Sequence, residues 1–281
     1  MSNMLTKYEI QGQHAASKFN DVNYMRSHHP ALFSTEAHPK MSERYAFTHT
    51  YDIVDALQKK DYGIATIQGG YNRFDQLLVR MRHRQYIDTD VRHADGAPEL
   101  IIIDSHDGSK ALKLALGYIR FVCMNGCIAG DLLYHRSFRH NSRDLMTDVM
   151  IEVLSINSYV ASLTQSVDAM RQYRTTIGDR LRLADIATIQ RFGDDRDETF
   201  KLHMRNKLLT RRRREDTAED LHTVVNVIQE NSLRGGFSYD SRPMSPRGRM
   251  MRARPVNSIN TNVKLNTALW NEATTIMQRA A

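Results

Sequence analysis

Residues 99–130 constrain the fold more than any other stretch, because they contain two apolar runs separated by a turn signal. Residues 100–104 are apolar and largely β-branched, and residues 111–123 alternate and then become apolar. Asp107 and Gly108 lie between the runs, and an Asp-Gly pair favours a type I′ turn, in which both central residues have positive φ. The sequence therefore predicts a β-hairpin here.

The composition is that of a globular chain with an ordinary proportion of charged residues. With 281 residues, 41% of them hydrophobic, the chain can hold one large domain or two modest ones. No apolar run approaches the ~20 residues of a membrane span, and residues 1–13 have no signal-peptide core. The two cysteines, Cys123 and Cys127, are expected to be buried thiols. We expect a cytoplasmic protein with no membrane partner, no metal and no cofactor.

Positive charge is concentrated near the C-terminus. Residues 1–200 contain 24 Lys or Arg against 25 Asp or Glu, whereas residues 201–281 contain 15 against 7. The first part therefore has a net charge of −1 and the last part +8. A localised basic surplus favours a polyanionic partner, most often nucleic acid.

Hydrophobic periodicity divides the chain into an N-terminal arm (1–45), a sheet core (46–140) and a helical region (141–281). In the core we expect a helix capped by Thr50, a strand over 63–67, and a segment over 77–86 that reads either as a strand or as a helix begun by Asp75. As a strand, it would present Arg80, Arg82 and Arg84 on one exposed face at period two. That face could contact phosphates or be simply solvated.

The helical region is expected to begin with one long helix over 141–177, roughly 50 Å at ~1.5 Å per residue, that ends at Gly178. Shorter helices follow, and the last spans 262–279. Residues 237–255, rich in Gly, Ser, Pro and Arg, are expected to form a basic flexible loop. The fold class is therefore α+β: a curved antiparallel β-sheet with a hairpin, packed by a long helix and a C-terminal helical half.

Four blocks of the sequence resemble the signature of a known family. Residues 105–109 (SHDGS), 120–125 (RFVCMN), 229–236 (QENSLRGG) and 263–270 (VKLNTALW) are similar to blocks of the DUF932 family of phage- and plasmid-encoded proteins. The resemblance implies a phage or plasmid context and no defined chemistry. The expected layout is similar to that of Rad52-type annealing proteins, as an analogy of architecture alone.

The leading functional hypothesis is a phage- or plasmid-type protein that binds single-stranded DNA as a homo-oligomer, for annealing, recombination or replication. Phosphate neutralisation and base stacking would supply the binding. The expected basic groove consists of Arg80, Arg82, Arg84, Lys110, Arg136, Arg139, Arg211, Arg212, Arg213 and Arg214.

Two alternatives stay open. Asp104, His106 and Asp107 could hold a metal ion for phosphodiester hydrolysis, which would make the protein a nuclease. In a different use of the same loop, the hairpin tip (His106, Asp107 and Gly108) would offer His106, together with Lys110, to a ligand. The other alternative is a protein that binds a host factor. Nucleotide-binding loops and nucleophile motifs are missing from the sequence, so no enzymatic activity is predicted.

Overall fold

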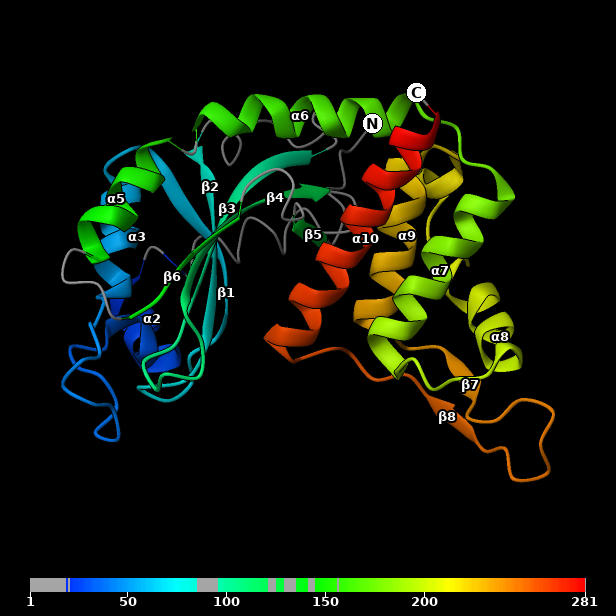
Figure 1. Ribbon diagram of the computed structural model, residues 1–281, viewed down its shortest axis with the longest axis horizontal. Coiled ribbons are helices and arrows are strands. Elements are labelled where there is room, and N and C mark those ends of the chain that lie inside the picture. Colours follow the sequence, from blue (N-terminus) through cyan, green and yellow to red (C-terminus); the bar gives the residue numbers. More distant parts are fainter. Residues whose placement is uncertain are drawn as a thin grey trace, which may run out of the picture. The chain divides into compact units, whose positions relative to one another are not determined.

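The computed structural model describes residue 19 and residues 21–84, 96–120, 125–128, 135–140, 145–155 and 157–280 (Figure 1). The chain divides into two compact units. The N-terminal unit comprises residues 1–126 and 133–162, and the C-terminal unit comprises residues 127–132 and 163–281. The architecture is α+β, as the sequence predicted.

The N-terminal unit is built on an antiparallel sheet. Its strands are β1 (Tyr62–Gly69), β2 (Leu77–His83), β3 (Gly96–Asp104), β4 (Leu112–Arg120), β5 (Asn125–Ile128) and β6 (His135–Phe138). They follow the order β1-β2-β3-β4-β5, and β6 also pairs with β4. The segment that could be a strand or a helix is thus a strand. The hairpin is confirmed, because β3 and β4 pair from Gly96 opposite Arg120 to Ile103 opposite Lys113.

Helices pack against this sheet. They are α2 (Val22–His28), the 3-10 turn η1 (Pro30–Phe33), α3 (Thr50–Gln58) and α5 (Leu145–Ser155), and α3 contacts β1, η1 and α5. Ile53 of α3 and Leu32 of η1 are fully buried. Thr50 does not cap α3, since the cap position is His49 and the Thr50 hydroxyl donates instead to Asp104.

The long helix expected over 141–177 is described as two, α5 and α6 (Asn157–Gln172), on either side of residue 156, which lies outside the described residues. Gly178 does not end a helix but lies inside α7 (Ile177–Phe192). The start of α7 is fixed by Thr176, whose hydroxyl accepts from the backbone of Asp179 while the Asp179 carboxylate accepts from the backbone of Thr176. This reciprocal pair is a capping box.

The C-terminal unit is a helical bundle. It contains α7, α8 (Glu198–Leu208), the 3-10 turn η2 (Arg214–Thr217), α9 (Leu221–Arg234) and α10 (Ile259–Ala280), with α10 packed on α7 and α9. Trp270, Leu265 and Phe200 are in its core. No helix among the described residues is long and apolar enough to cross a membrane.

A short antiparallel ribbon lies between α9 and α10, where the sequence predicted a loop throughout 237–255. Its strands are β7 (Ser238–Asp240) and β8 (Met250–Arg252), and Tyr239 pairs with Met251. Figure 1 shows the ribbon and its connecting loop extending beyond the ends of the bundle helices. Composition alone indicated a loop, because strands of three residues carry no periodic signal.

Candidate nucleic-acid interface

The loop that joins β3 to β4 is longer than the predicted turn. Seven residues, 105–111, separate the strands, and only Gly108 has a positive φ, of +72°. A type I′ turn at Asp107-Gly108 is therefore wrong, because Asp107 does not adopt the required conformation. Its carboxylate instead accepts a hydrogen bond from the backbone N–H of Ser109 at 2.9 Å, which closes an Asx-type turn.

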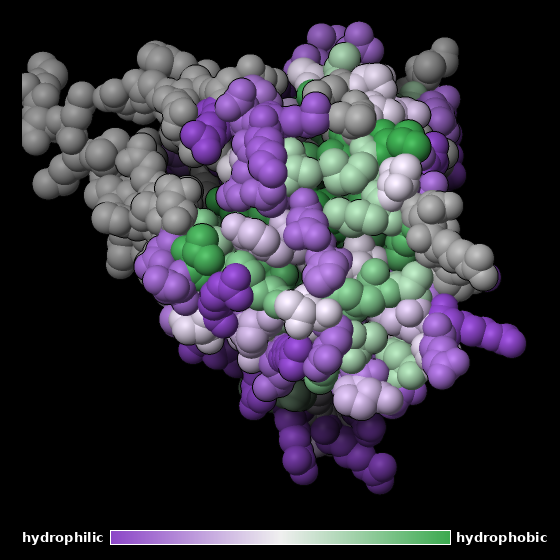
Figure 2. Space-filling model, turned by 90° about the vertical axis from the view of Figure 1, so that its left-hand side faces the viewer, coloured by the Kyte–Doolittle hydropathy of each residue, from purple (hydrophilic) through white to green (hydrophobic). Residues whose placement is uncertain are grey.

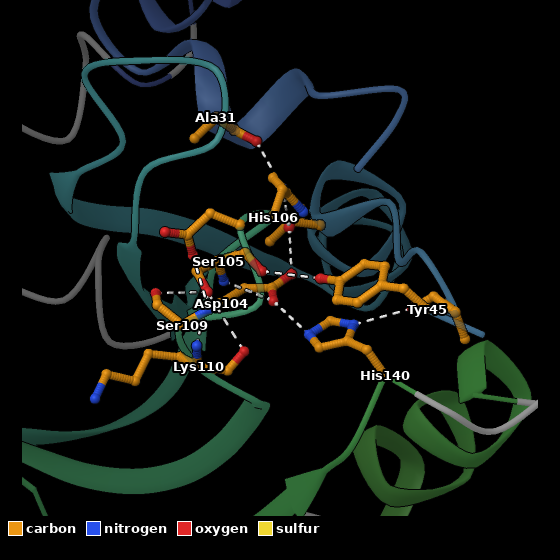
Figure 3. A network of polar contacts seen from close by, with 11 residues as sticks. Ala31, Tyr45, Asp104, Ser105, His106, Ser109, Lys110 and His140 are labelled. Atoms are coloured by element: carbon orange, nitrogen blue, oxygen red, sulfur yellow. Dashed lines mark hydrogen bonds and ion pairs between the residues drawn. The ribbon is translucent and has the colours of Figure 1, made fainter. Parts of the chain in front are cut away.

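The polar residues that lead into this loop are buried in the N-terminal unit (Figure 3). Asp104 and His106 have no exposed surface. The Asp104 carboxylate accepts from the hydroxyl of Thr50 at 2.7 Å and from the backbone of Ser105 at 2.8 Å. His106 Nε2 lies 2.9 Å from the carbonyl oxygen of Ala31 and therefore donates to it.

His140 and Tyr45 complete this network. His140 lies with Nε2 3.4 Å from Asp104 and Nδ1 3.0 Å from the carbonyl oxygen of Ala46. Tyr45 stacks on the His140 ring at 4.6 Å and donates to the carbonyl oxygen of Ser105. Desolvation by burial raises the pKa of Tyr45 and lowers that of His106. The network ties together η1, α3, the β3–β4 loop and the segment after β6.

This geometry corrects the two roles expected for the loop. His106 cannot meet a ligand at the hairpin tip, because its ring is inside the unit, and the side chain of Lys110 extends away from it (Figure 3). Asp107 turns outward to Lys40, at 3.9 Å. Among the described residues, no three His, Cys, Asp or Glu side chains are grouped so that they could hold a metal ion. Nothing in the geometry favours the nuclease hypothesis.

The expected basic face of β2 is also not exposed. The side chains of Arg80 and Arg82 are only 10% exposed, and both bind the carboxylate of Glu99, which is completely buried. Arg80 Nη1 lies 3.1 Å from Glu99 Oε2, and Arg82 Nη2 lies 2.8 Å from Oε1. The prediction that Arg80 and Arg82 share one face of the strand was right, but that face is buried rather than exposed. Only Arg84, just beyond β2, is exposed.

The other basic residues expected in the N-terminal unit are scattered. Arg136 of β6 lies 3.3 Å from Glu152 of α5, Arg139 is exposed, and Lys110 is half-buried. Figure 2 views the unit from the side of α3 and α5 and shows hydrophobic side chains mixed with hydrophilic ones. Ile151, for example, is 59% exposed. A mixed surface of this kind does not favour a polyanion.

In the arginine run 211–214 of the C-terminal unit, two residues contact the end of α9, although one of them, Arg212, is exposed. Arg212 donates to the side chain of Asn231 and to the carbonyl oxygen of Gly235, and Arg213 binds both carboxylate oxygens of Glu230. These two arginines hold the end of α9. Arg211 lies 3.8 Å from Glu219, and Arg214 is exposed.

A denser cluster of exposed arginines lies on the ribbon. We call residues 238–254 the arginine ribbon; it contains five arginines and a single acidic residue, Asp240. All five arginines are exposed, and in the described part of the chain none forms an ion pair: Arg242, Arg247, Arg249, Arg252 and Arg254. Tyr239 anchors the ribbon by packing against Phe192, Phe200 and Phe237.

A cleft of about 920 Å³ lies at the base of the arginine ribbon, and we call it the basal cleft. Its lining includes the arginines Arg191, Arg234, Arg252 and Arg254 and the rings of Phe192 and Tyr239. None of the described residues that line it is Asp or Glu. Arg234 also pairs with Glu230 at 3.0 Å, so its charge is partly compensated.

Arg191 is the residue of the basal cleft that most clearly lacks a counter-charge. It projects from the last turn of α7 and donates through Nη2 to the carbonyl oxygen of Arg254. Its Nη1 is buried and has no hydrogen-bond partner within the described part of the chain. Burial lowers the pKa of Arg191, although a guanidinium in a protein stays charged at neutral pH. A buried donor of this kind leaves room for a partner from outside the described residues, such as a water molecule or an anion.

Sequence reasoning missed Arg191 and Tyr239 because they look like ordinary residues of a helix and of a loop. The available signal was the six arginines and one carboxylate of residues 234–256. The prediction recognised a basic flexible loop there but did not include its arginines in the expected groove.

Comparison with known proteins places the chain in a family. It belongs to the family described as "Domain of unknown function (DUF932)", whose model matches residues 37–270. Two relatives from Escherichia coli (strain K12) are similar along nearly their whole length. The UPF0380 protein YfjQ is 28% identical over 283 residues, which cover 93% of this chain and 97% of the relative. The UPF0380 protein YafZ is 27% identical over 272 residues, which cover 91% and 94%. No solved structure matches the chain.

Proposed function

We propose that the protein binds single-stranded nucleic acid through the arginine ribbon and the basal cleft. The observation that carries the proposal is the basal cleft itself, because arginines and aromatic rings line it and no described lining residue is acidic. A cavity with uncompensated cations attracts an anion, and a polyanion can continue from it along the five arginines of the ribbon.

The mode of binding is phosphate neutralisation combined with stacking. Arg252 and Arg254 contact successive phosphates at the mouth of the cleft, and Arg191 supplies its free N–H to a phosphate oxygen deeper inside. The rings of Phe192 and Tyr239 stand beside these arginines and offer faces to unpaired bases, which is why we propose a single strand rather than a duplex. The proposed role is binding without bond chemistry, in recombination or replication.

Salt dependence of oligonucleotide binding tests the proposal. Fluorescence anisotropy of a labelled 20-nucleotide oligothymidylate is measured at increasing salt concentrations. For single strands, log K falls with log salt at about 0.7 per phosphate contact, so the double variant Arg252→Ala/Arg254→Ala should lower the slope by roughly 1.4. The affinity of this double variant for the oligonucleotide at low salt should also be lower than that of the wild type.

A matched control separates the arginine ribbon from the groove that the sequence suggested. Arg84→Ala/Arg139→Ala removes two exposed arginines of the N-terminal unit and should leave both affinity and slope unchanged. Absence of wild-type binding at low salt, or an equal loss in the two double variants, would refute the proposal.

A further inference from the structure

The tip of the arginine ribbon places a methionine where a β-turn calls for glycine. The backbone N–H of Ser245 donates to the carbonyl oxygen of Arg242 at 3.1 Å, which closes a turn with Pro243 second and Met244 third. Met244 has φ +62°. A turn with proline second and a positive φ at the third position is type II, and that position favours Gly or Asn. A side chain such as methionine is strained there.

Packing of the Met244 side chain does not offset this strain. Met244 is 95% exposed, the highest fraction among the exposed large hydrophobic side chains of the described residues. A strained, fully exposed apolar residue costs stability in the free protein. Strain of this kind is often retained at functional sites.

The rest of the tip holds Met244 in place. A second turn follows at once, with Pro246 in its second position and the backbone N–H of Gly248 donating to Ser245 at 2.8 Å. Ser241 and Arg249 close the loop through backbone and hydroxyl hydrogen bonds at 3.0 and 3.1 Å. Because both turns have proline in the second position, where its φ is fixed, few conformations are open to the tip.

Three arginines line a hollow at the tip of the ribbon, close in sequence to Met244. The hollow has a volume of about 500 Å³, and its lining includes Arg242, Arg247 and Arg249. The tip therefore combines one projecting apolar side chain with three cations. Proteins that unstack nucleic acids use this combination: Met or Pro inserts between neighbouring bases while arginines bind the flanking phosphates.

We infer that Met244 is a wedge that inserts between adjacent stacked bases of the bound strand. Arg242, Arg247 and Arg249 hold the phosphates on either side of the opened step. This inference rests on the proposed binding of a single strand by the ribbon. It adds that binding disrupts base stacking at one position.

The test uses an oligodeoxyadenylate that contains 2-aminopurine, whose fluorescence rises when it loses its stacked neighbours. Wild-type protein should raise the emission several-fold at saturation. Met244→Ala and Met244→Gly should abolish the rise while the salt slope of binding stays that of the wild type, because phosphate contacts set the slope. Glycine is the preferred residue at this turn position, so unfolding cannot explain its loss of signal.

Met250→Ala is the matched control, since Met250 is 70% exposed on β8 of the same ribbon but outside the tip. It should keep the full rise. Salt-dependent binding without any rise, or with a rise that survives Met244→Ala, would refute the wedge and leave the proposed function standing. An equal loss in Met250→Ala would also refute it. If the wild type does not bind at all, the proposed function itself fails.

Discussion

Replacement of Glu99 by glutamine tests whether the arginines of β2 are structural. Glu99→Gln keeps the shape of the side chain but removes a buried negative charge that binds both Arg80 and Arg82, whose guanidinium groups donate to it at 2.8, 3.1 and 3.2 Å. The Glu99 side chain is 0% exposed and each arginine only 10%, so water cannot replace the lost charge. Breaking a buried ion pair of this kind costs about 3–5 kcal/mol of unfolding free energy.

Urea unfolding measures this loss. With a slope of roughly 2 kcal/mol per molar urea, the midpoint should fall by roughly 1.5–2.5 M. Far-UV circular dichroism follows both units, whereas fluorescence of the single tryptophan, Trp270, follows the C-terminal unit. The transition seen by circular dichroism but not by tryptophan emission belongs to the N-terminal unit, and it is the one that should shift.

Glu152→Gln is the control, because it makes the same chemical change in a pair exposed to solvent. Glu152 and Arg136 are 28% and 50% exposed, so the loss should be about 0–1 kcal/mol. If Glu99→Gln costs no more than Glu152→Gln, the arginines of β2 are not held by Glu99, and their exclusion from the nucleic-acid surface loses its basis.

Three further predictions concern other buried contacts. Burial lowers the pKa of His106, so on acidification the unfolded state binds a proton more readily than the folded state does. The free energy of unfolding should therefore be highest above the ordinary histidine pKa of about 6.5 and should decline below it. In urea titrations between pH 7 and 5, His106→Gln should reduce this decline. Glu230→Gln removes the charge of a buried carboxylate that pairs with Arg213, which also lies 3.7 Å from Asp216. The unfolding free energy followed by Trp270 fluorescence should fall by about 3–5 kcal/mol. Gly235 has φ +60°, and Gly235→Ala places a Cβ 2.5 Å from the carbonyl oxygen of Ala253, so it should lower the free energy of unfolding by about 1–3 kcal/mol. Gly236 also has a positive φ but has open space around it, so Gly236→Ala should cost less. Thermal unfolding of the two variants measures the difference.

The fold was predictable where one physical signal dominated. The β3–β4 hairpin follows from two apolar runs on either side of a turn signal. The turn inside the hairpin was not predictable from Asp107-Gly108. The buried Asp104 and His106 draw the loop into contacts with η1 and α3, and a local turn preference cannot compete with that network.

The candidate site was less predictable because charge patterns carry no information about burial. Arg80 and Arg82 have the spacing of an exposed stripe, and only the antiparallel pairing of β2 with β3 reveals that both arginines reach the Glu99 side chain. Likewise, the run 211–214 reads as four equivalent cations, yet Arg213 meets Glu230 only because η2 and α9 are adjacent in space. Contacts between residues distant in sequence decided both cases.

The position of the carboxylates therefore determines where the proposed polyanion would bind. An arginine already bound to a buried carboxylate attracts a phosphate only weakly, because the nearby negative charge cancels its field. To contact a phosphate, it would also have to break its ion pair inside the protein. Glu99 and Glu230 are buried carboxylates of this kind, whereas Glu152 and Glu219 are partly exposed partners of Arg136 and Arg211. In the arginine ribbon the one carboxylate, Asp240, accepts from the backbone of Arg242 and leaves the guanidinium groups unpaired. The ribbon alone carries a net charge of +4, half of the surplus of the last 81 residues. Reversing its charge should weaken nucleic-acid binding more than reversing an equal number of arginines anywhere else in the described chain.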